Sequence, residues 1–279
     1  MQSLGCHRTL PLCIFETMQL LIKYLKLWWI FTVRTAQIAF ESRLGILIFT
    51  LGKLLRFGFH SLFIFIILKE SRVLAGYNIL EIFLFFAVFN LIDSLAQFML
   101  REVYRFRRQI VSGYFDYVLS WPINPLFKSL FAGADLLDLP MIFISGSIVV
   151  FILTKLDFSG LNLLLFMLFV LNALIIALAF HISVLSLGVI TTEVDNTLWI
   201  YRDFLQMARL PVDIYREPLK TLITFIIPVS IMVTIPVKAL LGLLSVEIMI
   251  ISFGIGLTFL AGSLYFWKIA LRHYSSASS

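Results

Sequence analysis

The stretch between residues 161 and 187 contains no Asp, Glu, Lys or Arg. A helix of this length rises about 40 Å at ~1.5 Å per residue, which is enough to cross the hydrocarbon core of a bilayer. Charged residues make up 14% of the 279 residues and hydrophobic residues 61%, whereas a soluble domain has about 25% charged residues. Long apolar runs favour helices, because the strands of a membrane barrel alternate apolar and polar side chains. We therefore expect an all-α integral membrane protein.

The apolar runs predict six membrane-spanning helices within a single transmembrane domain that covers residues 1–279. The expected spans are 44–68, 79–100, 139–154, 161–187, 221–235 and 246–267. Before the first span, residues 14–43 carry apolar positions at helical spacing, with basic residues on one face and aromatic residues on the other. This pattern is typical of an amphipathic helix that lies in the membrane interface.

Two prolines interrupt the apolar run before the last span. Pro228 and Pro236 each lack the backbone donor that a helix requires, and irregular backbone at membrane depth is tolerated only where protein or a cavity surrounds it. We expect residues 221–235 to cross the membrane and residues 236–244 to dip back into it as a re-entrant segment. The last span offers small residues for close helix contact at Gly254, Gly256 and Gly262.

Four arginines lie within eight positions directly after the second expected span, at Arg101, Arg105, Arg107 and Arg108. Positive charge beside a span is retained on the cytoplasmic side. With the N-terminus placed inside, cytoplasmic segments hold sixteen of the 22 Lys and Arg residues, including those of the polar interval 188–220. We therefore expect both termini to be cytoplasmic, and the protein to lie in the cell (inner) membrane.

A short amphipathic helix is expected near residues 111–119, within this basic loop. It should end at Trp121, because Pro122 removes a donor and restricts the residue before it. A short helix held at the bilayer surface between two spans would be a rigid lever.

Lys53, Arg56 and Asp93 lie well inside the expected spans. Lys53 and Arg56 share one helical face with His60, because spacings of three and four bring side chains together. A lone charge at this depth costs roughly 2.5–3.5 kcal/mol on insertion scales. We therefore expect Asp93 to pair with Lys53 or Arg56; alternatively, Lys53 reaches the inner headgroups and Asp93 faces a wet cavity. His60 is expected to be a packing residue with one backbone partner.

Motifs for several kinds of chemistry are missing from the sequence. It has no Gly-x-x-x-x-Gly-Lys-Ser/Thr phosphate loop, no His-Glu-x-x-His zinc motif and no Gly-x-Ser-x-Gly elbow. Cys6 and Cys13 form no metal-ligand spacing. The net charge of +6 lacks a soluble domain to present it to nucleic acid. We expect no cofactor, metal or catalytic site on this chain and no nucleic-acid partner. Met18 is an alternative start to Met1.

Two stretches resemble the ABC type-2 exporter permeases, in the branch in which two different permease chains share one ATPase. The first comprises 108–113, Phe115-Asp116, Leu119 and Pro122-Ile-Asn124-Pro125. The second comprises 209–215, 222–228 and 235–240. The resemblance covers roughly residues 34–272, and the Pro-x-Asn-Pro loop with the proline-interrupted fifth segment is its most specific part. Trp121 departs from the pattern, since many relatives carry a small residue or arginine there, which puts the exact docking contact in doubt.

This resemblance implies a non-catalytic permease subunit that pairs with a second permease, as a hetero- or homodimer. It also implies docking on a cytosolic ATPase dimer, which would carry the ATP and Mg. The residues that the resemblance assigns to ATPase coupling are Arg108, Gly113, Tyr114, Phe115, Asp116, Val118, Pro122, Asn124 and Pro125.

For the contact itself we expect the ATPase to grip Tyr114, Phe115, Tyr117 and Val118. Arg105, Arg107 and Arg108 would fix the depth of the loop against lipid phosphates. The alternative is that these aromatic residues form only an interfacial belt.

Three functions remain open from the sequence. The leading one is the permease subunit of an ATP-binding-cassette exporter. A secondary transporter would need no ATPase and would place paired carboxylates or broken helices around a midplane site. An intramembrane enzyme would need a paired catalytic constellation, and Asp93 alone does not make one. The apolar runs do not identify the transported substrate.

Overall fold

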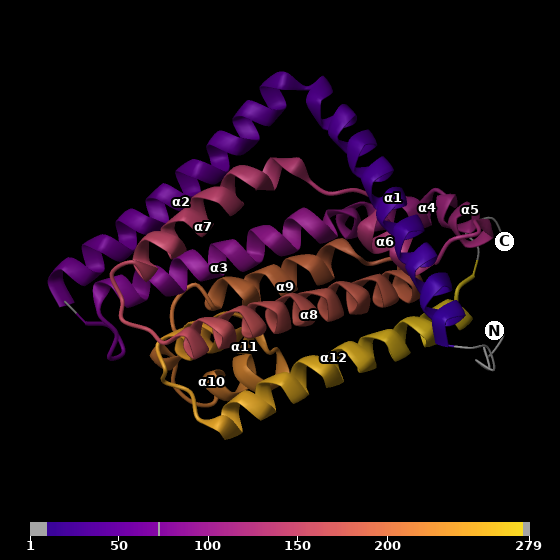
Figure 1. The fold of residues 1–279 in the computed structure, drawn as a ribbon. Helices are drawn as coiled ribbons and strands as arrows, with labels where there is room; N and C mark the ends of the chain where they lie inside the picture. The colour runs from indigo at the N-terminus through magenta and orange to yellow at the C-terminus, as the bar shows by residue number, and fades with distance from the viewer. Residues whose placement is uncertain (1–9, 72, 276–279) are drawn as a thin grey trace.

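The computed structural model describes residues 10–71 and 73–275, which are mostly helical and contain no β-strand (Figure 1). The long helices are α1 (Leu10–Glu41), α2 (Arg43–Ser71), α3 (Ile79–Leu100), α7 (Leu139–Leu153), α8 (Gly160–Thr191), α9 (Asp195–Met207), α11 (Val229–Leu240) and α12 (Val246–Arg272). The short helices are α4 (Phe106–Val111), α5 (Tyr114–Ser120), α6 (Pro125–Phe131) and α10 (Leu219–Thr221). An all-α membrane protein is therefore confirmed.

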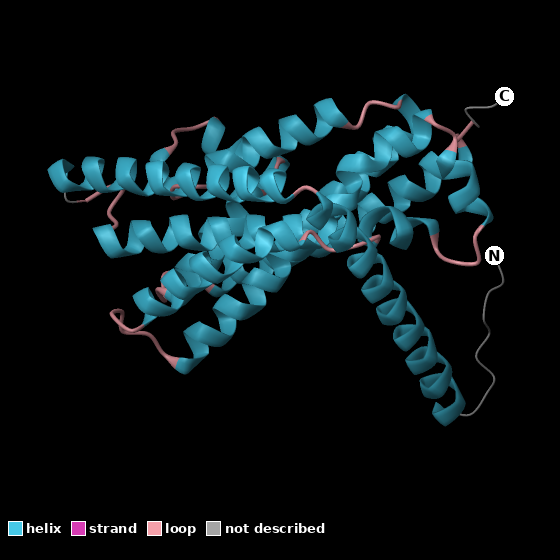
Figure 2. Ribbon diagram, turned by 90° about the horizontal axis from the view of Figure 1, so that it is seen from above, coloured by secondary structure: helices cyan, strands magenta, loops and turns pink. Residues whose placement is uncertain are grey.

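Five helical segments of the described residues are long and apolar enough to cross a membrane: Arg43–Glu70, Ile79–Val111, Pro125–Leu153, Gly160–Thr191 and Val246–Arg272. They overlap the first four expected spans and the last one. They run side by side in a bundle (Figures 1 and 2). We call the end that carries α4, α5 and α6 the arginine end, and the end that carries the α2–α3, α7–α8 and α11–α12 turns the opposite end.

The helices that start at the opposite end carry side-chain caps. Asn78 and Glu81 form a capping box at the start of α3. Ser159 accepts a hydrogen bond from a backbone amide of α8, and Ser245 does the same for α12. These caps accept hydrogen bonds from first-turn backbone amides that have no partner within the helix. Each helix therefore begins at a residue whose side-chain oxygen can accept such a bond.

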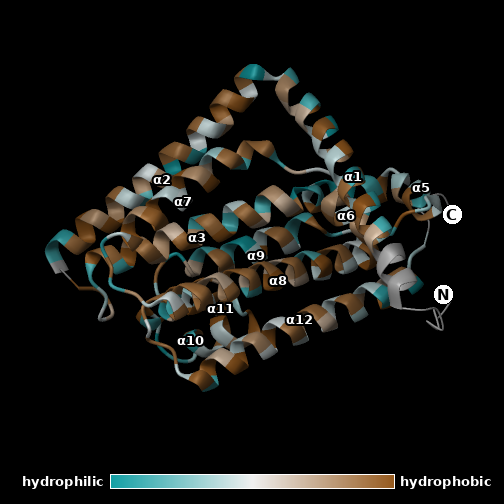
Figure 3. Cartoon of the chain, in the orientation of Figure 1, coloured by the Kyte–Doolittle hydropathy of each residue, from teal (hydrophilic) through white to brown (hydrophobic). Residues whose placement is uncertain are grey.

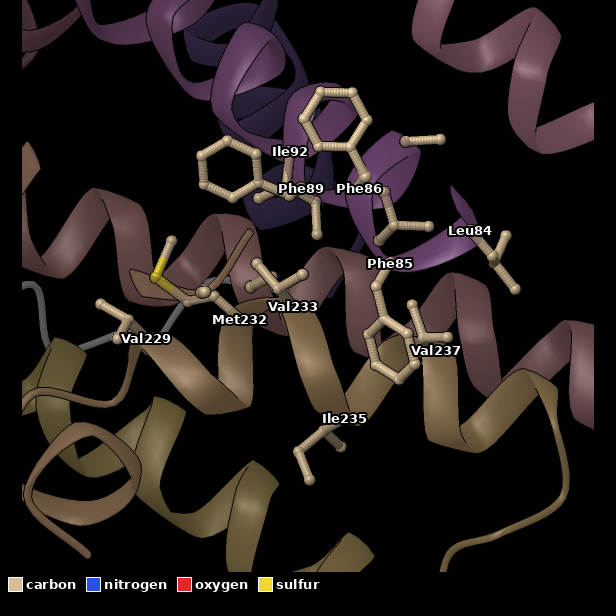
Figure 4. Close-up of a cluster of buried hydrophobic side chains, with 14 of the residues drawn as sticks. Leu84, Phe85, Phe86, Phe89, Ile92, Val229, Met232, Val233, Ile235 and Val237 are labelled. Atoms are coloured by element: carbon tan, nitrogen blue, oxygen red, sulfur yellow. The ribbon is translucent and has the colours of Figure 1, made fainter. Parts of the chain in front are cut away.

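The core lies where α3, α8 and α11 meet. Figure 4 shows α3 side chains such as Phe85 and Phe89 facing Met232, Val233 and Val237 of α11. Of α11, all but Lys238 is buried. The outward faces of α2 and α12 are instead apolar and exposed, as expected of helices whose solvent is lipid.

Helix α1 leaves the bundle at a steep angle (Figures 1 and 2). The Tyr24 ring packs against Phe127 of α6 at a centroid distance of 4.6 Å, and the Ala134 amide donates to the Thr32 hydroxyl at 3.1 Å. Apolar side chains such as Trp29 and Ile38 stay exposed. The interfacial position of this helix stays a prediction, and its exposed apolar surface agrees with it.

The expected fifth span, residues 221–235, falls within a bent pair of helical arms, Leu219–Ile226 and Val229–Leu240, which we call the hairpin. That residues 221–235 form a separate membrane span stays a prediction. Lys220 at the start of the hairpin and Lys238 near its end both contact the Asp213 carboxylate, at 3.1 and 2.7 Å. The first arm therefore starts on the same side as the one on which the second arm ends. The 90° bend falls between the arms at Pro228, where a missing donor ends the first arm. Pro236 lies inside α11 without breaking it.

The polar segment that contains α9 follows the bundle from one end to the other. At the arginine end, Arg107 pairs with Asp195 at 3.2 Å. Eighteen residues later, at the opposite end, Tyr77 donates to Asp213 at 3.1 Å. Between these points α9 runs antiparallel to α8, with Leu198 and its neighbours on the inner face buried.

Hydropathy placed this segment in a cytoplasmic loop, and the structure corrects that placement. Figure 3 shows α9 as a largely hydrophilic helix between hydrophobic neighbours. Its buried residues Leu198, Tyr201 and Leu205 form the inner face, and Arg202 lines a cavity. Polar side chains at membrane depth are tolerated where they face protein or a cavity. Besides the five apolar segments, residues 195–213 of the described chain therefore also run from one end of the bundle to the other.

Candidate functional site

The basic loop folds into two short helices with a sharp break between them. Helix α4 ends at Val111, and Gly113 follows with φ of 70°, a left-handed conformation that favours glycine. Helix α5 then runs from Tyr114 to Ser120 and ends where Trp121 becomes extended ahead of Pro122. The short helix expected near residues 111–119 is therefore α5, which begins three residues later than expected.

Two of the residues expected to touch an ATPase face the protein interior instead. Phe115 and Val118 are both 0% exposed. The Phe115 ring packs against Phe106 at 5.1 Å and Tyr274 at 5.2 Å. These two side chains hold α5 on the bundle, so their expected direct contact with a partner is wrong. A seven-residue helix beside a buried surface must place every third or fourth side chain inward.

The other expected contact residues lie on the outer face of α5. Tyr117 is 68% exposed, and Tyr114 is exposed beside Trp121, with ring centroids 6.3 Å apart. Val111, at the end of α4, extends the same apolar surface. We call Val111, Tyr114, Tyr117 and Trp121 the α5 outer surface. The sequence predicted this helix, and tertiary packing decided which of its side chains are free.

Asp116 connects α5 to the end of α12. The Tyr274 hydroxyl donates to the Asp116 carboxylate at 2.9 Å. Burial and the neighbouring Asp116 raise the pKa of Tyr274 to about 12, so this hydroxyl remains a donor throughout the physiological range. Asp116 therefore fixes α5 in position, and it lies too close to the bundle to be a free recognition residue.

The Pro-x-Asn-Pro residues form the start of α6. The Asn124 side chain accepts from the Leu126 amide at 2.9 Å, and Pro125 takes the first helical position, an arrangement that caps a helix N-terminus. The Asn124 amide also donates to the Tyr24 hydroxyl of α1 at 3.3 Å. The structure thus gives this motif a structural role that links α6 to α1.

Most arginines of the loop have carboxylate partners within the chain. Arg101 pairs with Asp135 at 3.3 Å, Arg105 with Glu102 at 3.2 Å, and Arg107 with Asp195 as described above. Arg108 is exposed, and none of the ion pairs of the described residues includes it. Of the three arginines expected to contact lipid phosphates, Arg108 is thus the one without such a partner.

A cavity of about 400 Å³ lies inside the bundle, between α2, α3, α7 and α9. It brings together the three intramembrane charges that the sequence singled out, Lys53, Arg56 and Asp93. The ion pair expected between Asp93 and Lys53 or Arg56 is not among those of the described residues, and Lys53 pairs with Asp138 instead. Asp138 lies in the turn before α7, a position whose proximity to α2 only the fold reveals.

Asp93 accepts a hydrogen bond from Gln97 at 3.4 Å and faces the cavity. His60 has the expected backbone partner, since its Nδ1 lies 2.7 Å from the Arg56 carbonyl oxygen. Its other ring nitrogen is bonded to Arg209, a contact that was not expected. Arg202 and Arg209 also line the cavity. Hydropathy did not predict this, because it places their segment in a cytoplasmic loop.

These features define a polytopic α-helical membrane protein with a charged cavity, a bent helical hairpin at one end and a short surface helix at the other. Comparison with models of protein families gives a match to the ABC-2 family transporter proteins over residues 54–278. The chain belongs to this family of ABC transporter permeases, which act together with an ATPase. Comparison with curated proteins and with solved structures gave no match.

Proposed function

We propose that this chain is the permease subunit of an ABC exporter and that α5 transmits the movement of a separate ATPase dimer to the membrane helices. In this proposal the ATP and Mg are bound by the partner ATPase. The arginine end faces the cytoplasm of the cell (inner) membrane, with both termini on that side. The basic residues between 101 and 128 support this orientation.

The observation that carries the proposal is the division of α5 into two faces. Its inner face is fixed to the bundle by Phe115 and Val118, both fully buried. Its outer face presents aromatic residues at a protein end that is otherwise rich in arginine. Exposed aromatic residues with adjacent arginines are typical of the anchor residues of protein interfaces. A surface held this firmly can transmit force, since packed elements move as rigid bodies.

The contacts of α5 supply routes from this surface into the membrane helices. One route leads through Phe106 and α4 to the end of α3. A second leads through Tyr274 to α12. A third passes along the connection to α6 and through Asn124 to Tyr24 of α1. Movement of α5 would therefore act on α1, α3 and α12 together.

We further propose that a second permease completes the transport pathway, as the family resemblance implies. One chain lines a partly open cavity of about 400 Å³, which is at the small end of the usual range for ligand sites. The exposed apolar surface of α2 and α12 is available to lipid or to a second copy of the fold. The direction of transport follows the same resemblance, which is to exporters.

The test is co-purification with an ABC ATPase that is co-expressed with this chain. The double variant Val111→Asp with Tyr117→Asp places charges on the α5 outer surface without touching the buried face. We expect it to lose the ATPase and the nucleotide hydrolysis that appears on co-expression, with at least a tenfold reduction, because an anchor residue contributes roughly 2 kcal/mol or more.

Phe158→Asp is the matched control, since Phe158 is an exposed aromatic residue of the turn at the opposite end. It should retain the ATPase. Undiminished ATPase binding by the double variant would contradict the proposed surface. Solute transport by the purified chain alone, without nucleotide, would instead identify a secondary transporter.

A further inference from the structure

The walls of the internal cavity carry more positive than negative charge. The charged groups that line it are Lys53, Arg56, Arg101, Arg202, Arg209, Asp93 and Asp138. They come from five parts of the chain, which the fold brings to one space inside the membrane-spanning bundle. Five basic side chains thus face two carboxylates in a region where charge is expensive to bury.

Only two of the basic groups are neutralised within the described chain. Lys53 is paired with Asp138, whose side chain is almost completely buried. Arg101 is paired with Asp135 at 3.3 Å. None of the ion pairs of residues 10–71 and 73–275 includes the other three basic residues, Arg56, Arg202 and Arg209.

Asp93 is the one lining carboxylate left to balance these three guanidinium groups. It accepts a hydrogen bond from the Gln97 side-chain amide at 3.4 Å. Asp203, which follows Arg202 on α9, is exposed and lies outside the cavity lining. The cavity therefore has a net positive charge that the surrounding side chains do not compensate.

One of the three arginines is held in place by its neighbours. His60 lies 2.7 Å through Nδ1 from the Arg56 carbonyl oxygen, which requires a proton on Nδ1. Its Nε2 is then free to accept a hydrogen bond from Arg209. The Arg209 guanidinium also lies over the Phe89 ring, 5.4 Å from its centroid. These contacts fix Arg209 while leaving its remaining donors available.

The rest of the lining combines apolar and aromatic side chains, among them Phe57, Phe86, Phe89 and Met141, with the polar residues His60, Asn90, Ser94 and Gln97. A guanidinium group matches the oxygen atoms of a phosphate with two parallel hydrogen bonds. A phosphate group would therefore satisfy the arginines, and an attached hydrocarbon chain would suit the aromatic wall. Both halves of such a molecule have a counterpart in the same cavity.

We infer that this cavity binds the phosphate headgroup of an anionic amphiphile during transport. The inference names a substrate class for the permease and so rests on the proposed function. Arg56, Arg202 and Arg209 hold the headgroup, His60 positions Arg209, and the aromatic wall contacts the start of the apolar chain.

Binding is tested on the full-length chain purified in an uncharged detergent. Native mass spectrometry would follow titration with phosphatidylglycerol, with phosphatidylcholine and with inorganic phosphate. We expect phosphatidylglycerol to bind in preference to phosphatidylcholine and inorganic phosphate to compete with it weakly. Equal binding of the two lipids, or binding of inorganic phosphate alone, would overturn the inference.

Glutamine substitutions locate the site. Combining Arg56→Gln, Arg202→Gln and Arg209→Gln should weaken phosphatidylglycerol binding at least tenfold, because each lost charge-assisted hydrogen bond is expected to lower affinity by roughly tenfold. Arg216→Gln is the matched control, since Arg216 is exposed at the opposite end and outside the cavity. An equal loss in the control would assign the lipid to the protein surface and overturn the inference.

Asp93→Asn provides a test that does not depend on removing arginines. It keeps the shape of the side chain, removes the one unpaired lining carboxylate and should tighten phosphatidylglycerol binding several-fold. Unchanged or weaker binding would contradict the cavity assignment. These measurements use no ATPase, so lipid binding without ATPase co-purification would refute only the proposed coupling, and the reverse result would refute only the substrate class.

Discussion

At the scale of single residues, Asp213 joins the start of the hairpin to its end. It accepts hydrogen bonds from Lys220, Lys238 and Tyr77, which lie in three separate parts of the chain. Burial opposes the charged form of this carboxyl, but the hydrogen bonds from the two lysines outweigh that effect and hold its pKa below the ordinary value of 3.8. Asp213 lies after the α9 crossing, at the opposite end of the bundle.

A carboxyl with a depressed pKa stabilises the fold above its unfolded pKa and loses that contribution as the pH falls through the folded value. We therefore expect Asp213→Asn to lower the thermal midpoint of the detergent-solubilised protein by a constant amount between pH 7 and pH 4. The difference between the two proteins should shrink only at more acidic pH. A difference that already disappears near pH 6 would show that another group controls the hairpin.

At the scale of elements, the closest contact between α8 and α12 depends on one glycine. A Cβ atom at Gly256 would lie 2.1 Å from the side-chain oxygen of Asn172. Asn172 is buried and donates to the Ser252 carbonyl of α12 at 3.1 Å. The sequence predicted a small-residue face at three glycines, but only tertiary packing distinguishes Gly256 from Gly254, where a Cβ atom would meet nothing within 4 Å.

Gly256→Ala should therefore destabilise the protein by roughly 1–3 kcal/mol, the usual effect of overpacking a tight contact. The measurement is thermal or denaturant unfolding in a single detergent. Gly254→Ala is the matched control and should be neutral or slightly stabilising, since alanine favours a helix more than glycine does. Equal destabilisation by both substitutions would mean that helix packing is not the cause.

At the scale of the whole molecule, the α9 crossing changes which surfaces share a side of the membrane. The turn around Arg216 lies at the same end as the α7–α8 turn, whereas Ser112 lies at the arginine end. The polar interval 188–220 therefore connects the two ends of the bundle. The chain still runs between the two ends of the bundle an even number of times after α1. Helix α12 therefore finishes at the arginine end (Figure 1).

Cysteine labelling in intact cells tests this topology. With Cys6 and Cys13 replaced by alanine, single cysteines would be introduced by Ser112→Cys, Asp157→Cys and Arg216→Cys. We expect an impermeant maleimide to label the second and third and to leave the first unmodified. Protection of the third together with the first would return the polar interval to the cytoplasm. Labelling of the first alone would reverse the orientation of the whole bundle.

The sequence by itself determined that the protein lies in a lipid bilayer and is all-α. It also determined the positions of the long apolar helices and the existence of a short helix in the basic loop. These properties depend on local composition and on the length needed to cross a bilayer, which the order of residues states directly. The tertiary structure decided which face of α5 is free, which carboxylate pairs with Lys53, and that the polar segment 195–213 runs from one end of the bundle to the other. Those outcomes depend on which distant segments shelter a polar or aromatic side chain, and hydropathy along the chain contains no information about such neighbours.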